Sequence, residues 1–135
     1  MEIEFATPEK DYEYLAQNDW HIRPETTRQK IERREIIVIR DNSQPVGWLR
    51  YGYLWDTVPF MNMLFIAEEK RRKKLGTKLV TYWEKEMQKR GHGMIMTSTQ
   101  SNEQAQHFYR RLGYQDAGAL LLPGEVLEII FLKSL

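Results

Sequence analysis

The strongest constraint on the fold is an unbroken run of β-branched residues at 36–39. Side chains in a strand alternate between the two faces of a sheet, so a run without polar alternation predicts a strand that is buried on both faces. Turn-forming residues follow at 41–45, and the segments 46–55 and 60–66 predict two further strands. A sheet of this kind needs helices on both of its faces.

The other expected elements follow from caps and apolar spacing. Thr7 before Pro8 is typical of a helix start, and a stripe that includes Leu79 and Trp83 predicts a long helix from residue 75 that Gly91 ends. The remaining predictions are strands at 2–5, 94–99, 115–121 and 127–133, helices at 8–17 and 25–34, and a helix capped by Asn102 and ended by Gly113. The order of these elements predicts an α/β fold with a mixed sheet.

Length and composition narrow the class of protein. A chain of 135 residues is one domain's worth, so we expect a single domain at 1–135. The chain has no cysteine, which excludes disulfides and a Cys nucleophile, and its three histidines lack ligand spacing, so we expect no metal. The first residues lack the basic and apolar pattern of a signal peptide, and no apolar run reaches membrane-spanning length. We therefore expect a cytoplasmic protein without a membrane partner.

A basic segment is the first candidate site. Five consecutive basic residues, 70–74, precede the long helix, and Gly76 and Thr77 lie in its first turn. The first N–H groups of a helix lack internal partners and carry the positive end of the helix dipole, so they bind phosphate. A solvated basic turn explains the same residues equally well. With 20 basic and 19 acidic residues in the chain, this local excess favours a small polyanion over a nucleic acid.

The segment 102–114 is the second candidate, and on its own it predicts an amphipathic helix in which Tyr109 packs beside Phe108. Together the two segments resemble the GNAT N-acetyltransferase superfamily. The cofactor motif of that family, Arg/Gln-x-x-Gly-x-Gly/Ala, is matched at Arg71, Lys74 and Gly76, and an apolar pair precedes it at Leu64 and Ile66. The later motif of the family is matched at Asn102, Ala105, Phe108, Tyr109, Gly113 and Tyr114.

This resemblance implies that acetyl-CoA is the co-substrate and that a mostly antiparallel sheet of six or seven strands, with about four helices, splays between its fourth and fifth strands. The pantetheine arm is expected in the gap, and Tyr109 is expected to protonate the departing thiolate. Backbone N–H groups near Leu64 and Phe65 are expected to polarise the acetyl carbonyl. The expected cofactor-binding residues are Leu64, Phe65, Ile66, Arg71, Arg72, Lys73, Lys74, Leu75, Gly76, Thr77, Asn102 and Phe108.

Two positions depart from the family pattern. Lys74 stands where a glycine is usual; we expect a helical backbone there, which suits lysine. Asn62 stands near the place of a frequent strand glutamate, and an amide cannot accept the proton of the amine. We expect Asp56, directly or through water, to serve as the base, with Glu125 and His21 as alternatives.

An unusual number of aromatic residues suggests where the acceptor binds. The expected acceptor-binding residues are Trp20, Tyr53, Trp55, Phe60, Asn62 and Glu125. Packing in the core is the competing interpretation for the aromatic members of this set. The predicted function is acetyl transfer to a primary amine of a small molecule or peptide. The alternatives are a CoA-binding module without activity and a nucleic-acid-associated protein, and a homodimer through an exposed strand is a further expectation.

Overall fold

The computed structural model describes residues 1–135. It contains seven strands, four α-helices and one 3₁₀ turn. In chain order these are β1 (Glu2–Phe5), α1 (Pro8–Asn18), α2 (Pro24–Glu32), β2 (Ile36–Asp41), β3 (Gln44–Leu54), β4 (Val58–Ile66), η1 (Glu68–Lys70), α3 (Leu75–Lys89), β5 (Met94–Gln100), α4 (Ala105–Arg111), β6 (Gln115–Leu120) and β7 (Glu128–Ser134). None of the helices is long and apolar enough to span a bilayer.

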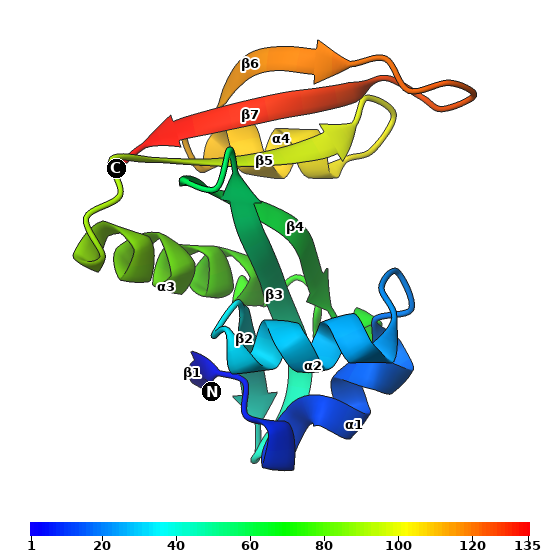
Figure 1. Ribbon diagram of the computed structural model, residues 1–135, viewed down its shortest axis with the longest axis vertical. Helices are drawn as coiled ribbons and strands as arrows, with labels where there is room; N and C mark the ends of the chain where they lie inside the picture. Colours follow the sequence, from blue (N-terminus) through cyan, green and yellow to red (C-terminus); the bar gives the residue numbers. More distant parts are fainter. The chain divides into compact units, whose positions relative to one another are not determined.

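Hydrogen bonding between the strands gives one sheet in the order β1-β2-β3-β4-β5-β7-β6. Figure 1 labels each strand. The pairs β1–β2, β2–β3, β5–β7 and β6–β7 are antiparallel, whereas β4 and β5 run parallel. This arrangement confirms the predicted mixed, mostly antiparallel sheet and its order of elements.

The chain divides into two compact units. The first contains Met1–Tyr51 and Met63–Trp83, and the second contains Gly52–Asn62 and Glu84–Leu135. The long elements β3, β4 and α3 therefore each contribute residues to both units.

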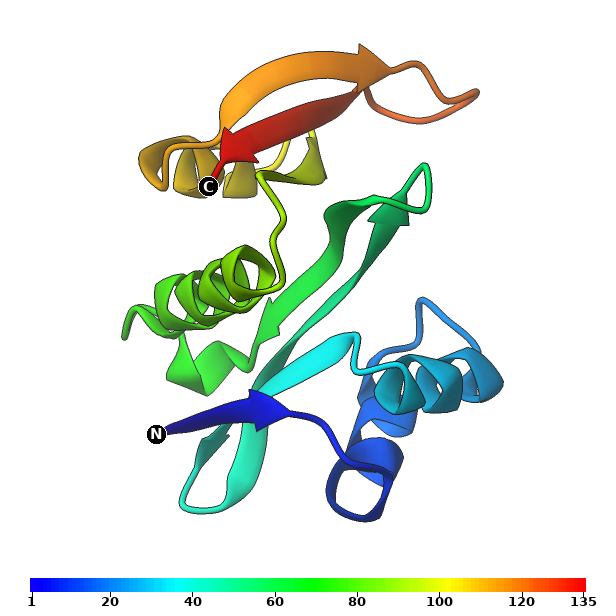
Figure 2. The ribbon, with the colours of Figure 1, turned by 60° about the vertical axis from the view of Figure 1, so that its left-hand side comes forward.

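In the first unit, β2 is buried on both faces, as the β-branched run predicts, and the middle of β3 is buried as well. Figure 2 shows α1 and α2 on one side of these strands and α3 on the other. One face carries Val38 and Trp48, which belong to a core cluster with residues of α1 and α2. The opposite face carries the paired Ile37 and Leu49, together with Phe5 of β1, whose ring meets the ring of Tyr82 from α3. The two faces thus bury separate apolar layers under α1–α2 and under α3.

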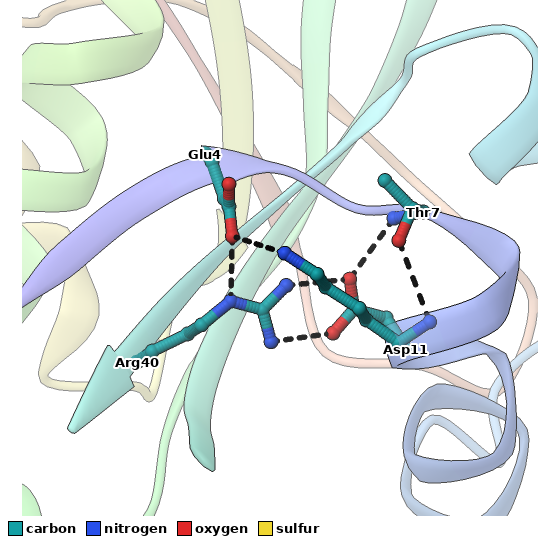
Figure 3. A network of polar contacts seen from close by, with 5 residues as sticks. Glu4, Thr7, Asp11 and Arg40 are labelled. Atoms are coloured by element: carbon teal, nitrogen blue, oxygen red, sulfur yellow. Dashed lines mark hydrogen bonds and ion pairs between the residues drawn. The ribbon is translucent and has the colours of Figure 1, made fainter. Parts of the chain in front are cut away.

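A buried ion pair fixes α1 to the first two strands (Figure 3). Both guanidinium nitrogens NH1 and NH2 of Arg40 lie 2.8 Å from the carboxylate of Asp11, and its Nε lies 2.8 Å from Glu4. The backbone N–H of Thr7 also donates to Asp11, at 2.9 Å, and the Thr7 hydroxyl accepts from Lys10 as the helix cap. The Asp11 carboxylate therefore binds both the start of α1, at Thr7, and the Arg40 side chain of β2.

In the second unit, β7 pairs with β5 on one side and with β6 on the other, and α4 lies along this part of the sheet (Figures 1 and 2). Thr97 and Phe131 are register partners whose side chains face α4, because the ring of Phe131 packs on Tyr109. β6 is an edge strand with all of its residues exposed. The loop at residues 121–127 connects it to β7 in a hairpin.

Some predicted boundaries were wrong. α2 ends at Glu32 rather than at Arg34, because Arg34 has a left-handed backbone with a φ of 58°. The cap of α4 is Gln104 rather than Asn102, and no side chain bonds to this helix start. Asn102 lies exposed in the preceding turn.

Candidate active site

The parallel pairing of β4 with β5 is the centre of the candidate site. Phe60 is paired with Met96 and Met61 with Thr97, and the Thr97 hydroxyl donates to the Met61 carbonyl at 2.9 Å. Because side chains alternate along a strand, Phe60 and Met96 project from one face of this pair and Met61 and Thr97 from the other. The strand pair thus separates two environments.

Tyr109 of α4 occupies the face that carries Met61 and Thr97. It is 5% exposed, and its hydroxyl donates to Sδ of Met61 at 4.0 Å. Its ring packs against those of Tyr114 and Phe131. Burial raises the pKa of Tyr109, and a hydrogen-bond interaction with the Thr97 side chain offsets the rise only in part. Tyr109 is therefore a protonated phenol at neutral pH, which is the form that a general acid needs.

A cavity of about 400 Å³ opens on the opposite face. Its floor includes Phe60 and Asn62 of β4 with Met96 of β5. The complete lining is Tyr53, Leu54, Phe60, Asn62, Met96, Leu120 and Ile130. Three of the residues expected to bind the acceptor, Tyr53, Phe60 and Asn62, therefore meet in one cavity.

Three other predicted residues of this unit do not line that cavity. Trp55 and Asp56 form the tight turn between β3 and β4, with φ values of 55° and 62°. The Thr57 N–H closes this turn on the Leu54 carbonyl at 3.1 Å. Glu125 lies exposed in the loop between β6 and β7.

Trp20 belongs to the first unit. It follows α1, is 78% exposed and stacks on His21 with ring centroids 3.9 Å apart. Nδ1 of His21 lies 3.5 Å from the buried carboxylate of Asp19, which also binds Nε of Arg50 at 2.7 Å. Asp19 thus anchors the exposed loop that carries the two stacked rings.

The basic segment before α3 also lies in the first unit, and only part of it is free to meet a ligand. Lys70 forms an ion pair with Asp41 at 2.8 Å, and the Arg71 Nε donates to the Ile66 carbonyl at 2.8 Å. Arg72, Lys73 and Lys74 are exposed. Their ammonium and guanidinium groups supply the positive charge at the helix start.

The backbone of this segment corrects the expectation for Lys74. Arg72 and Lys74 have φ values of 67° and 62°, so Lys74 is left-handed and not helical. The usual glycine at this place of the motif adopts such a backbone without a steric penalty, and lysine does not. A left-handed residue followed by the helical Leu75 turns successive N–H groups toward one concave surface, which is a known form of anion site.

Comparison with known proteins agrees with this geometry. The model of the acetyltransferase (GNAT) family matches residues 3–114. The chain belongs to the GNAT family. Its resemblance to that family, carried by the motifs at 71–76 and 102–114, is confirmed. A comparison with curated protein sequences finds no match.

Solved structures with the same GNAT fold share little sequence with this chain. An aminoglycoside 6'-N-acetyltransferase complexed with coenzyme A is 20% identical, with a TM-score of 0.77 over 99% of this chain and 97% of that one. A ribosomal-protein-alanine N-acetyltransferase from Brucella melitensis is 20% identical, with a TM-score of 0.81 over 100% of both chains. Ard1 from Thermoplasma volcanium is 14% identical, with a TM-score of 0.82 over 98% and 96%.

The sequence did not reveal several residues of this candidate site. Met61 and Thr97 contact Tyr109, and Met96, Leu120 and Ile130 line the cavity. The alternation of Thr97 and Thr99 was a visible signal for one face of β5. Leu120 and Ile130 gave no signal, because their place in the cavity depends on the position of the β6–β7 hairpin beside β5.

Proposed function

We propose that the protein transfers an acetyl group from acetyl-CoA to a primary amine of a small molecule or peptide, by direct attack of the amine. One observation carries this proposal. The buried Tyr109 phenol lies on one face of the β4–β5 pair, and the cavity lies on the other. With the acid and the acceptor on opposite sides, the amine would reach the carbonyl carbon from one side while the leaving sulfur takes its proton from the other.

The residues before α3 fit the phosphates of acetyl-CoA. The N–H groups around Lys74 and Leu75 form the concave surface, and the exposed Arg72, Lys73 and Lys74 add positive charge. Gly76 and Thr77 continue this surface into the first turn of α3. A structural neighbour is complexed with coenzyme A, which supports acetyl-CoA as the co-substrate.

In this proposal, the last residues of β4 bind the pantetheine and thioester end of acetyl-CoA. Leu64, Phe65 and Ile66 are half-buried and lead directly into the basic segment. Their backbone would pair with the pantetheine arm, and the N–H groups near Leu64 and Phe65 would polarise the thioester carbonyl. Acetyl-CoA supplies the acetyl group as an activated thioester.

In the transfer itself, Tyr109 acts as the general acid. A bond forms between the amine nitrogen and the carbonyl carbon, and the bond from that carbon to sulfur breaks. Tyr109 gives its hydroxyl proton to the leaving sulfur and recovers a proton from solvent, while the amine loses one proton. Holding the two reactants at the same strand pair supplies much of the rate enhancement.

The proposal is tested by calorimetric titration with acetyl-CoA, followed by a panel of amines with release of the CoA thiol as the readout. Micromolar binding with thiol release for at least one amine supports the enzyme. Binding without release for any amine favours a CoA-binding module without catalysis. A variant with Gly76→Glu, which places bulk and negative charge at the phosphate surface, should bind acetyl-CoA at least about tenfold more weakly while staying folded.

A further inference from the structure

The chemistry of the cavity restricts the acceptor. All of its lining residues are uncharged, and the polar groups among them are the Tyr53 hydroxyl and the Asn62 amide. The remaining surface comes from aliphatic, aromatic and thioether side chains, namely Leu54, Phe60, Met96, Leu120 and Ile130. No carboxylate is available inside the cavity to pair with a second ammonium group.

The β6–β7 hairpin beside the cavity carries further exposed apolar residues. Leu120 lines the cavity and is itself 48% exposed, and Leu121 beside it is 86% exposed. Leu122, Val126 and Leu127 are further exposed apolar residues of the same hairpin. Exposed apolar residues grouped beside a cavity are typical of a binding site.

Desolvation decides between the classes of amine. A polyamine or an aminoglycoside carries several ammonium groups, and each one that enters this cavity would lose water without gaining a carboxylate partner. An aryl or branched alkyl group instead leaves water favourably when it enters an apolar cavity. The reacting amine itself must be neutral to attack, so it needs hydrogen bonds and not a counter-charge.

We propose that the acceptor is a primary amine whose substituent is uncharged and apolar, of the arylalkyl or branched-alkyl type. This inference rests on the proposed acetyl transfer. The Asn62 amide oxygen accepts a hydrogen bond from the amine at the β4–β5 pair, and the substituent lies over Met96, Ile130 and Leu120. A free arylalkylamine and a peptide with an amino-terminal phenylalanine share this chemistry.

The test compares matched acceptors by thiol release with saturating acetyl-CoA. The panel contains 2-phenylethylamine, 1,4-diaminobutane, kanamycin and a short peptide with an amino-terminal phenylalanine. We expect kcat/KM for 2-phenylethylamine or the peptide to exceed that for the diamine and the aminoglycoside by about tenfold or more. Comparing 2-phenylethylamine with the peptide shows whether the preferred amine is a free small molecule or the amino terminus of a peptide. A preference for the diamine or kanamycin would overturn the inference while leaving acetyl transfer established.

Two variants on neighbouring residues sharpen the test. Leu120 and Ile130 lie on the same face of the hairpin, whereas Ala119 is paired with Ile129 and projects from the other face. Leu120→Glu brings a carboxylate into the cavity, and Ala119→Glu adds the same charge outside it. We expect Leu120→Glu to lower kcat/KM for 2-phenylethylamine about tenfold and to raise it for 1,4-diaminobutane. Ala119→Glu should leave both values unchanged.

A binding measurement separates failure of this inference from failure of the proposed function. We expect 2-phenylethylamine to shift NMR signals of the Met96 methyl group in the wild-type protein and in Ala119→Glu, and to shift them much less in Leu120→Glu. Binding of this kind without thiol release from any amine would contradict the proposed acetyl transfer but not the apolar cavity. Equal behaviour of the two variants would show that the cavity is not the acceptor site.

Discussion

The hydroxyl of Tyr109 lies 4.0 Å from Sδ of Met61, inside the layer between α4 and β4. The neighbouring side chains of β4, Phe60 and Asn62, point to the other face and line the cavity. A proton on Tyr109 and an amine in the cavity therefore approach the same short stretch of β4 from opposite sides. This relationship separates the proposed acid from the proposed acceptor site in a way that mutations can test.

Replacing Tyr109 by phenylalanine removes the proposed acid and little else. We expect Tyr109→Phe to lower kcat about 100-fold or more, the range for loss of a general acid, while the Kd for acetyl-CoA stays within about twofold. Tyr114→Phe is the matched control, because it removes a second buried hydroxyl that binds Glu84 instead. A kcat for Tyr109→Phe equal to that of the wild type at every pH would exclude Tyr109 as the acid.

The pH dependence of the reaction should report the acceptor. The cavity contains no carboxylate or imidazole, so we expect the amine to lose its proton to water before it attacks. The value of kcat/KM should then rise tenfold per pH unit up to the pKa of the amine itself. Acceptors with lower pKa values should shift the whole profile to lower pH by the same amount.

The variant Asp56→Asn distinguishes this route from a protein base. Asp56 lies exposed in the β3–β4 turn and does not line the cavity. If water is the base, the variant keeps the wild-type profile, and if Asp56 relays the proton, kcat/KM falls at every pH below the pKa of the amine.

The local patterns that predicted this fold act over a few residues. Leu79 and Trp83 are fully buried on one stripe of α3, as their helical spacing predicts. The β-branched run at 36–39 is buried on both faces because helices cover both. Glycine and capping signals placed the ends of most elements within two residues. Apolar spacing, glycines and capping residues are local signals, so they can be recognised in the sequence alone.

The features that the sequence did not predict depend on contacts between residues distant in sequence or on an unusual backbone conformation. Asp11 pairs with Arg40 across 29 positions, and Asp19 pairs with Arg50 across 31. No pattern along the chain marks such partners. Lys74 adopts a left-handed backbone that its residue type disfavours, because the turn into α3 requires it. The geometry of the turn before α3 thus outweighed the backbone preference of Lys74.

The alkaline stability of the protein should depend on Tyr114. Burial raises the pKa of Tyr114 above its ordinary value of 10.0, and the nearby Glu84 carboxylate raises it further. Protonation of this phenol therefore contributes stability that is complete below pH 10 and is lost as the pH rises above 10. Each such group lowers the free energy of unfolding by about 1.4 kcal/mol per pH unit in that range.

The measurement is urea unfolding of the wild type and Tyr114→Phe between pH 8 and pH 11. The variant should be less stable at pH 8, because it loses the hydrogen bond to Glu84, and its stability should fall less steeply above pH 10. Parallel curves for Tyr114→Phe and the wild type would show that Tyr114 does not carry this dependence.

The ion pair between Asp11 and Arg40 should be a large single contribution to stability. Asp11 is 0% exposed and Arg40 is 5% exposed, so Asp11→Ala leaves a buried guanidinium with Glu4 as its remaining acidic partner. We expect a loss of about 3–5 kcal/mol in the free energy of unfolding, measured by urea denaturation. Asp116→Ala breaks an exposed pair with Arg110 and should cost far less. Equal losses in the two variants would contradict the role of burial.

The left-handed backbone at Lys74 gives a prediction that separates strain from charge. Lys74→Gly removes both the side chain and the steric penalty of a φ of 62°, whereas Lys74→Ala removes the charge and keeps the penalty. We expect the glycine variant to be about 1 kcal/mol more stable than the alanine variant in urea unfolding. Equal stability would mean that Lys74 is not left-handed in solution.

The same two variants test whether the Lys74 ammonium reaches a phosphate of acetyl-CoA. If it does, both variants should raise the Kd for acetyl-CoA by a similar factor, and the factor should shrink at high salt because exposed charges are screened. If the backbone N–H groups carry the binding, the glycine variant should bind as tightly as the wild type. Thr57→Ala, in the β3–β4 turn, is the control that should leave the Kd unchanged.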